Sequence, residues 1–378
     1  MHWLTNPQVR RQAHALKWST YPEDQLPLWV ADLDCEAPPI VKTLLNDAAD
    51  HGVFGYGLEP PAFRDAWVTH IHKAYQWNID PDWIVPIAGV VPAMTYGLEC
   101  FPDRQRVLSP SPAYPYFAGV PERARRALER YPLEHTDAGL VPDLLALAGL
   151  LDQSHKPSVL LLCNPHNPGG AVYSKQCLND IITLAVETET PLISDEIWAD
   201  LRLDPVPHYP LGQLVPETHP SLTIMAATKT FNIAGFSAAI AIVPHAPTRE
   251  RLLATQIAMP HITPLAFAMT AGCLQEGWDW HRMLLDALRI NRARVQMWAN
   301  AHPNIRVTTG QATFLAWIEA PLTEADWITG LTDAKVRLSM GRPFGDATAV
   351  RLNYGTSPTI LDEALGRLST VLTNRDCP

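Results

Sequence analysis

The sequence predicts an α/β fold, in which a mostly parallel sheet carries helices on both faces, with a smaller α+β domain after it. Short apolar runs such as Ser158–Cys163 and 222–226 have the composition of strands buried on both faces, and they alternate with helical segments. The pattern changes near residue 275, and a long arginine-rich helix follows at 280–299. At about 100–200 residues per domain, the 378 residues allow two or three domains.

The elements of the first part follow from apolar spacing and from glycine and proline positions. Apolar residues recur at helical spacing over 37–50 and 63–75, and the glycine-rich segment 51–61 between them is predicted to be a loop. Strands and helices then alternate: we expect strands at 83–87 and 106–109, and helices at 92–100 and beginning over 113–118.

The same alternation of strands and helices continues through the middle of the chain, and an α+β pattern with antiparallel strands follows it. The middle is predicted to hold strands at 158–163, 191–194 and 222–226, a helix at 177–188, a loop at 164–170 and a small-residue apolar segment at 233–243. After it come an amphipathic helix at 280–299, antiparallel strands at 305–309 and 313–318, a strand at 349–353 and a helix at 359–372. We therefore divide the chain into an N-terminal segment (1–40) that joins the small domain, a large domain (41–274) and a small C-terminal α+β domain (275–378).

Composition excludes several classes of protein. Hydrophobic residues make up 47% and charged residues 18%, which is unlike a disordered chain or a coiled coil. The net charge of −10, without any polybasic block, argues against nucleic acid or an anionic membrane as the partner. Six separated cysteines without a CxxC pair, no signal-peptide pattern and no apolar run of membrane-spanning length predict a reduced, soluble cytoplasmic protein.

Lys229 is the residue that points most directly to chemistry. It is the only lysine between Lys175 and Lys335, and it has no charged neighbour from 221 to 243. Apolar surroundings lower the pKa of an amine and make it nucleophilic, as a Schiff-base lysine requires. The alternative is a lysine at a strand end that points into solvent.

Two further motifs lie upstream of Lys229. Asp195 lies at the carboxyl end of a buried strand, at the end of the sheet where open α/β proteins bind ligands, and the alternative is the N-cap of a helix. The loop 164–170 contains two Asn-Pro steps that restrict the backbone, and alone it could be a turn without a function. Motifs of zinc proteases, nucleotide-binding proteins and α/β-hydrolases are absent, and no metal site is predicted.

Taken together, these motifs resemble those of fold-type I pyridoxal-phosphate enzymes. The order NPHNP (164–168), SDEI (194–197) and TKTFN (228–232) is similar to the class I/II aminotransferase family, within it to the MalY/PatB-type cystathionine β-lyases, the C–S lyase branch. The resemblance covers about residues 25–370, and its further segments are LWVADLD (28–34), HGVFGY (51–56), GVVPA (89–93), SPAY (111–114) and VRLN (350–353). It implies the aspartate aminotransferase-like fold, with a seven-stranded type of sheet in the large domain.

The resemblance also implies pyridoxal 5'-phosphate as the cofactor and assigns residues to it. Lys229 would hold the cofactor and transfer protons, and Asp195 would pair with its pyridine nitrogen. Asn167 would bond the ring hydroxyl, and Tyr114 would stack on the ring as a third catalytic residue.

Phosphate binding and the partner subunit involve a further set of residues. The backbone of Val90 and Val91 would meet the phosphate at a helix N-terminus, and Thr228 would lie beside it. Tyr56 would reach across a homodimer interface into the partner's cofactor site.

Substrate binding is carried over in the same way. Arg351 would grip the α-carboxylate of an amino-acid substrate with its planar guanidinium, and Ala31, Asn167 and Cys35 would line the substrate site.

The sequence departs from the family pattern at four positions. Ser237 stands eight residues after the lysine, where many relatives have an arginine and the lyase branch commonly has none. Trp198 replaces the tyrosine or histidine that usually follows the aspartate by three residues, and Gly169 replaces a threonine. Cys35 stands where phenylalanine is usual, which predicts a changed substrate pocket.

The resemblance implies a C–S β-lyase. Such an enzyme cleaves cystathionine or a related cysteine S-conjugate, or its sulfoxide, to pyruvate, ammonia and a thiol or sulfenic acid. An aminotransferase is the first alternative, because residue types alone do not decide between elimination and transamination. A non-catalytic regulatory or interaction protein on the same fold is the second, although the intact pair of Lys229 and Asp195 argues against it.

Overall fold

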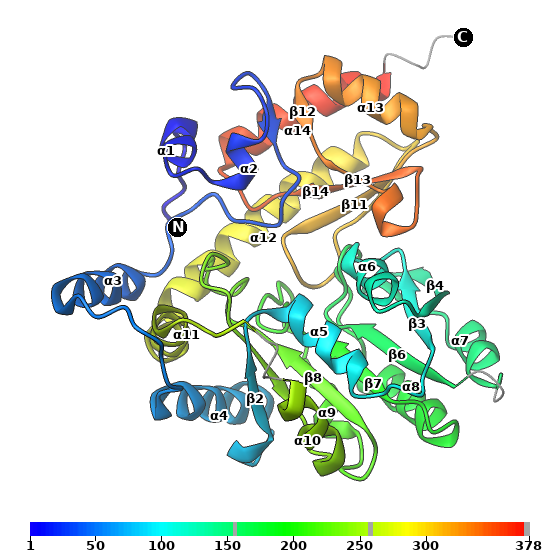
Figure 1. Ribbon diagram of the computed structural model, residues 1–378. Helices are drawn as coiled ribbons and strands as arrows, with labels where there is room; N and C mark the ends of the chain where they lie inside the picture. The colour runs from blue at the N-terminus through cyan, green and yellow to red at the C-terminus, as the bar shows by residue number, and fades with distance from the viewer. Residues whose placement is uncertain (154–156, 256–259, 374–378) are drawn as a thin grey trace.

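A mixed eight-stranded sheet forms the centre of the computed structural model, which describes residues 1–153, 157–255 and 260–373 (Figure 1). The spatial order of its strands is β2 (Ile84–Ile87), β9 (Ala239–Ile242), β8 (Ser221–Met225), β7 (Leu192–Asp195), β6 (Ser158–Cys163), β3 (Arg106–Ser111), β4 (Ala127–Thr136) and β5 (Gly139–Pro142). The strands from β8 to β4 are parallel, while β9 pairs antiparallel with β8 and β2, and β5 pairs antiparallel with β4. The predicted parallel sheet is therefore confirmed at its centre, and β5 adds an edge strand to the seven expected.

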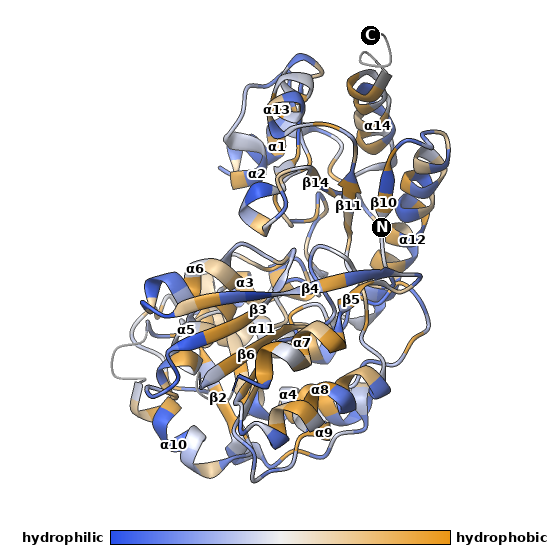
Figure 2. Ribbon diagram, turned by 90° about the vertical axis from the view of Figure 1, so that its right-hand side faces the viewer, coloured by the Kyte–Doolittle hydropathy of each residue, from blue (hydrophilic) through white to orange (hydrophobic). Residues whose placement is uncertain are grey.

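Helices cover both faces of this sheet, as the apolar strands predicted. Along β6, Val159 and Leu161 pack on the side of α5 (Val90–Glu99), α6 (Tyr116–Arg123) and α10 (Ala246–Thr255). Leu160 and Leu162 pack on the opposite side with α7 (Leu144–Leu151), α8 (Lys175–Glu187) and α9 (Leu211–Leu214). Because successive strand residues point to opposite faces, a strand that is apolar at every position is buried on both. Figure 2 shows β6 as a largely hydrophobic strand in the interior of the large domain.

Three helices pack together beside the β2 edge of the sheet. They are α3 (Pro39–His51), α4 (Pro61–Tyr75) and α11 (Pro264–Glu276), with α11 against both of the others (Figure 1). The loop between α3 and α4 agrees with the predicted glycine-rich loop, and a short turn of helix, η1 (Pro81–Trp83), leads from α4 to β2.

The C-terminal part has its own small sheet, reached through the long helix α12 (Trp278–Asn300). The order of its strands is β10 (Arg306–Thr308), β11 (Leu315–Glu319), β14 (Ala349–Asn353) and β13 (Ser339–Met340), with α13 (Glu324–Asp333), η3 (Arg342–Phe344) and α14 (Pro358–Thr373) around it. The pairing of β10 with β11 confirms the predicted antiparallel strands.

The N-terminal segment lies against this C-terminal part. After α1 (Pro7–Gln12) and α2 (Leu16–Ser19), strand β1 (Leu26–Pro27) pairs in parallel with β12 (Val336–Arg337). This pairing is consistent with an N-terminal segment that joins the small domain, and the boundaries at 40 and 274 remain an interpretation.

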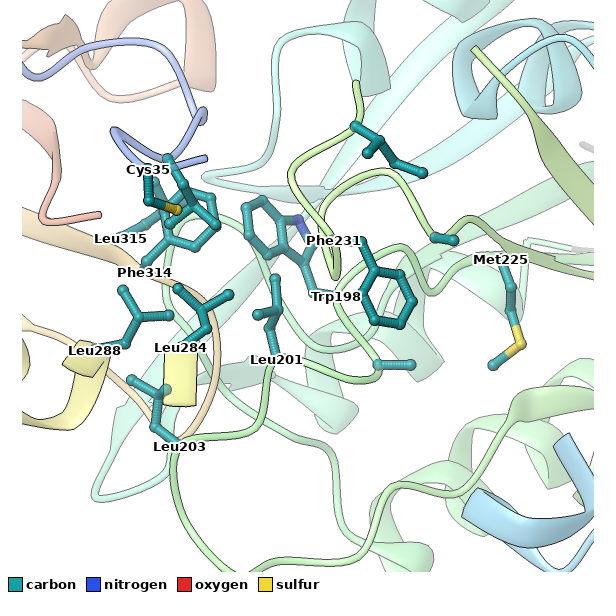
Figure 3. Packing of buried hydrophobic residues seen from close by; sticks show 14 of the residues in the cluster. Cys35, Trp198, Leu201, Leu203, Met225, Phe231, Leu284, Leu288, Phe314 and Leu315 are labelled. Atoms are coloured by element: carbon teal, nitrogen blue, oxygen red, sulfur yellow. The ribbon is translucent and has the colours of Figure 1, made fainter. Parts of the chain in front are cut away.

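The two parts share one hydrophobic cluster. Figure 3 shows Trp198 beside Phe314, with Leu284 and Leu288 of α12 and Cys35 of the N-terminal segment nearby. The ring centroids of Trp198 and Phe314 lie 5.1 Å apart in an edge-to-face contact. This packing fixes the N-terminal segment and the small sheet above the carboxyl ends of the large sheet's strands.

Candidate active site

The loops at the carboxyl ends of β3, β6, β7 and β8 bring together the residues singled out in the sequence. Tyr114 follows β3, Asn167 follows β6, Asp195 ends β7 and Lys229 follows β8. The Tyr114 backbone N–H donates to the Asn167 carbonyl at 3.1 Å, and the Asn164 N–H donates to the Asp195 carbonyl at 3.0 Å. Parallel strands end at one edge of the sheet, so residues far apart in the sequence meet there.

Lys229 faces the N-terminal segment. Its Nζ donates to the Ala31 carbonyl oxygen at 2.6 Å and lies 3.7 Å from Asp32 Oδ1. Burial lowers the pKa of Lys229, with Asp32 opposing the shift and Arg351 adding to it. A depressed pKa raises the fraction of neutral, nucleophilic amine, which is what the isolation of Lys229 in an apolar segment predicted.

Asp195 is a buried carboxylate that has a hydrogen bond but no direct ion pair in the described part of the chain. Its side chain accepts a hydrogen bond from the Ile197 N–H at 3.1 Å, and burial raises its pKa to about 7. The next residue, Glu196, pairs with His208 at 2.8 Å, and its like charge adds to the rise in the pKa of Asp195. A cationic N–H donor beside Asp195 would satisfy this carboxylate and keep it ionised.

Arg351 reaches the same site from β14 of the small sheet. Its guanidinium donates to Asn167 Oδ1 at 3.0 Å and to the Trp29 carbonyl at 2.9 Å, and it lies over the Phe344 ring at 4.8 Å. Its Nε is buried and has no hydrogen-bond partner among the described residues. Burial lowers the pKa of Arg351 to about 10, so the group stays charged at neutral pH.

The N-terminus of α5 offers a place for an anion. Gly89 precedes the helix with a φ of 117°, and a Cβ there would lie 3.2 Å from the Ser237 Oγ. Val90 and Val91 are half-buried in the first turn, and Thr228 is buried beside Lys229 in sequence. Free backbone N–H groups at a helix start favour an anion such as a phosphate.

These residues fit pyridoxal 5'-phosphate. Lys229 supplies a reactive amine, Asp195 a buried carboxylate with no direct ion pair in the described ranges, Asn167 an amide, and the start of α5 an anion site. Tyr114 is half-buried with its pKa raised to about 12 by burial, so its phenol is neutral at ordinary pH.

The large sheet with this site at its strand ends defines a fold-type I pyridoxal-phosphate enzyme. The family model "Aminotransferase class I and II" matches residues 23–368, and the chain belongs to this family. Among curated proteins it is similar to "Cystathionine beta-lyase PatB" of Bacillus subtilis, 30% identical and covering 97% of this chain and 98% of that one. It is also 27% identical to "Protein MalY" of Escherichia coli over 91% of both chains.

Solved structures agree with this family. The "Crystal Structure of OvoB" superimposes with a TM-score of 0.91 at 33% identity, covering 96% of this chain and 97% of that one. Cystalysin from Treponema denticola, whose title names a pyridoxal 5'-phosphate cofactor, gives 0.91 at 26% identity over 99% of both chains. None of the helices in the three described ranges is long and apolar enough to cross a membrane.

Three of the residues singled out in the sequence lie apart from this cluster within one chain. Tyr56 is 98% exposed, with its ring 5.9 Å from that of His261. Trp198 lies in the core against Phe314, so packing of the two domains accounts for this departure from the family pattern. Cys35 is also in the core.

Gly169 has a steric explanation. A Cβ at this position would lie 2.5 Å from the Cβ of Leu140 on β5. The close passage of the loop over β5 excludes the threonine of the family pattern.

Two residues of the site were not singled out in the sequence. Asp32 approaches Lys229, and Asn353, fully buried, donates to the carbonyl oxygens of Val30 and Asp32 at 2.5 and 2.8 Å. Both residues lie in segments that resemble the family, and this resemblance was the signal in the sequence that could have identified them.

Cys35→Phe tests whether Cys35 selects the substrate. The Cys35 side chain is 4% exposed, and its backbone carbonyl accepts a hydrogen bond from Asn232 at 2.9 Å, which favours a packing role. Adding a ring to this packed position should cost about 1–3 kcal/mol of stability. We expect a lower Tm and a uniform decrease in kcat/KM across several conjugates. A change in preference among conjugates, without loss of Tm, would place Cys35 in the substrate pocket after all.

Asp195→Asn tests the ionisation of Asp195 without measuring activity. In the cofactor-free protein the pKa of about 7 lies above the ordinary 3.8, so the folded state holds this proton more tightly than the unfolded state. Asp195 therefore destabilises the fold progressively as pH rises from 4 to 7, by roughly 4 kcal/mol above pH 7. The variant should unfold at higher denaturant concentration than the wild type at pH 8 and at a similar one at pH 4. A difference that does not depend on pH would mean that Asp195 ionises normally.

Proposed function

We propose that this protein is a pyridoxal-phosphate-dependent C–S β-lyase that cleaves cystathionine or a related cysteine S-conjugate, including sulfoxides. The observation that carries the proposal is the convergence of Lys229, Asp195 and Arg351 on one site at the strand ends. Full-length similarity to cystathionine β-lyases supports it. When bound, the cofactor would act as an electron sink for the negative charge left at Cα when its proton is removed.

The chain's own residues divide the remaining work. Arg351 binds the substrate α-carboxylate through two parallel hydrogen bonds and so orients the amino acid. Lys229 would accept the Cα proton, and its lowered pKa increases the fraction of neutral amine that can do so. Asp195 would hold the cofactor's pyridine N–H, and the Asn167 amide would donate to its ring oxygen.

The overall reaction balances with water as the only co-reactant. The Cβ–S bond breaks, the thiolate leaves with the bonding electrons and takes a proton, and water replaces the amino group at Cα. The products are pyruvate, ammonia and a thiol, or a sulfenic acid from a sulfoxide.

Pyruvate release tests this function against transamination. An aminotransferase relative, an aspartate aminotransferase of Pyrococcus abyssi, is 26% identical over 93% of this chain. The holoenzyme, incubated with cystathionine or an S-alkyl cysteine, should release pyruvate without an added keto acid. Strict dependence on a keto acid would identify an aminotransferase. No spectral change with any amino acid would favour a non-catalytic role.

We propose that the active unit is a homodimer in the cytoplasm. The loop that carries Tyr56 exposes four large apolar side chains, Val53, Phe54, Tyr56 and Leu58, to between 64% and 98%. A contiguous exposed apolar surface is typical of a protein interface. The cysteines among the described residues are free thiols, as a reduced compartment would keep them, and Cys377 lies outside those residues.

Mixed dimers test the proposed role of Tyr56. The Tyr56→Ala and Lys229→Ala variants should each be nearly inactive, because each lacks one group in both sites. Mixed dimers of the two should regain activity, since one of their sites holds Lys229 together with the partner's tyrosine. Sedimentation should show a dimer at assay concentration. A fully active monomer, or mixed dimers without activity, would contradict the proposal.

A further inference from the structure

Asp32 places a partly exposed carboxylate beside Lys229. Its Oδ1 lies 3.7 Å from Lys229 Nζ, and its side chain is 38% exposed. In residues 1–153, 157–255 and 260–373, Lys229 is the one ion-pair partner found for this carboxylate. By contrast Arg351 is only 4% exposed, so the site has a deep cation and an anion near its surface.

The backbone at Asp32 is fixed from two sides. Its carbonyl oxygen accepts hydrogen bonds from Asn353 Nδ2 at 2.8 Å and from Lys17 Nζ at 3.2 Å. Lys17 is itself anchored by its ion pair with Asp34 at 3.0 Å, where both side chains are 2% exposed. The carboxylate therefore projects from a held segment, which suits a group that discriminates between ligands.

Lys229 is unable to remain the partner of Asp32 during catalysis. The proposed function engages the Lys229 nitrogen with the cofactor and then uses it to accept the Cα proton. The substrate's own α-carboxylate is held at Arg351, so Asp32 is left facing the site without a compensating cation. A like charge brought beside it is disfavoured, and a cation is favoured.

We propose that Asp32 is a specificity-determining residue that selects cysteine S-conjugates with an ammonium-type cation on the S-substituent and disfavours those whose substituent carries only a carboxylate. This inference rests on the proposed lyase function and deepens it. Since Asp32 is partly exposed, solvent screening limits the preference, and it should weaken as the salt concentration rises.

Three conjugates of similar size and different charge test the proposal. They are S-(2-aminoethyl)-L-cysteine, S-propyl-L-cysteine and S-carboxymethyl-L-cysteine, and kcat/KM for pyruvate release is measured for each with the wild type and with Asp32→Asn. Asparagine keeps the shape and removes the charge. We expect the ratio of kcat/KM for the cationic conjugate to that for the anionic conjugate to fall about tenfold in the variant, and the neutral conjugate is the reference for any general change that Asp32→Asn causes through Lys229. Asp137→Asn, on the exposed β4–β5 turn, is the matched control for a lost surface charge and should keep the wild-type ratio.

The outcomes separate this inference from the function beneath it. If the wild type releases no pyruvate from any of the three conjugates or from cystathionine, the lyase function fails. If it does release pyruvate but Asp32→Asn keeps the wild-type selectivity ratio, the specificity role is overturned. An equal loss of kcat/KM for all three conjugates would also overturn it, because Asp32 would then act through Lys229 and not on the S-substituent. Kd values of the conjugates for the cofactor-loaded Lys229→Ala variant, with and without Asp32→Asn, give a second measure that requires no turnover.

Discussion

Lys229→Ala should abolish pyruvate release while leaving the fold intact. Loss of a positioned general base alone typically costs about 10²- to 10⁴-fold in rate, and this variant also loses the amine that holds the cofactor. Structural damage should be small, because the Lys229 amine contacts only Ala31 O and Asp32 among the described residues and neither contact belongs to the buried core.

Borohydride reduction of the wild-type holoenzyme gives an independent measure. Peptide mapping should locate the pyridoxyl group on Lys229. Lys42→Ala, an exposed lysine on α3, is the matched control and should keep both activity and labelling. A label on any other lysine refutes the assignment, even if Lys229→Ala proves inactive.

Two strands that are buried along their whole length could be predicted to the residue. Both β6 and β14 were predicted with the bounds that the structure has, because each is a continuous run whose residues are all buried. The segment at β4 was not predicted as a strand. Its exposed and half-exposed charged residues, such as Glu129 and Arg130, leave no alternation of apolar and polar residues to recognise. The segment is a strand because it pairs with β3. The helix expected from 113 begins at Tyr116, after the prolines at 112 and 115.

The residues of the candidate site that could be predicted are those in short motifs at the ends of buried strands. Lys229, Asp195 and Asn167 each end or follow a buried strand, so the order of the chain already places them at one edge of the sheet. Asp32 could not be located in this way. Its place depends on Asn353, 321 residues later, whose amide holds the Asp32 carbonyl oxygen. The burial of Trp198 and Cys35 likewise depends on the small sheet packing above them.

Arg351→Lys should lower kcat/KM by about 30- to 1,000-fold, equivalent to roughly 2–4 kcal/mol of transition-state binding. Lysine keeps the positive charge, but it is unable to make two parallel hydrogen bonds to a carboxylate. It would also withdraw a donor from Asn167 Oδ1 or from the Trp29 carbonyl, both of which Arg351 holds at about 3 Å. Arg342→Lys, on a surface ion pair whose arginine is 67% exposed, is the matched control and should be close to wild type.

A loss of activity alone would not separate carboxylate binding from a packing defect, since Arg351 also lies over the Phe344 ring. The carboxamide analogue of the same conjugate makes this distinction. If the guanidinium binds the α-carboxylate, the wild type should prefer the acid to the amide strongly, and Arg351→Lys should lose much of that preference. If the arginine only supports the fold, acid and amide should lose activity by the same factor. An Arg351→Lys variant close to wild type would place the carboxylate site elsewhere. A carboxylate that leaves water needs a partner that is charged at every working pH. The Arg351 guanidinium meets this need because it stays ionised despite its burial.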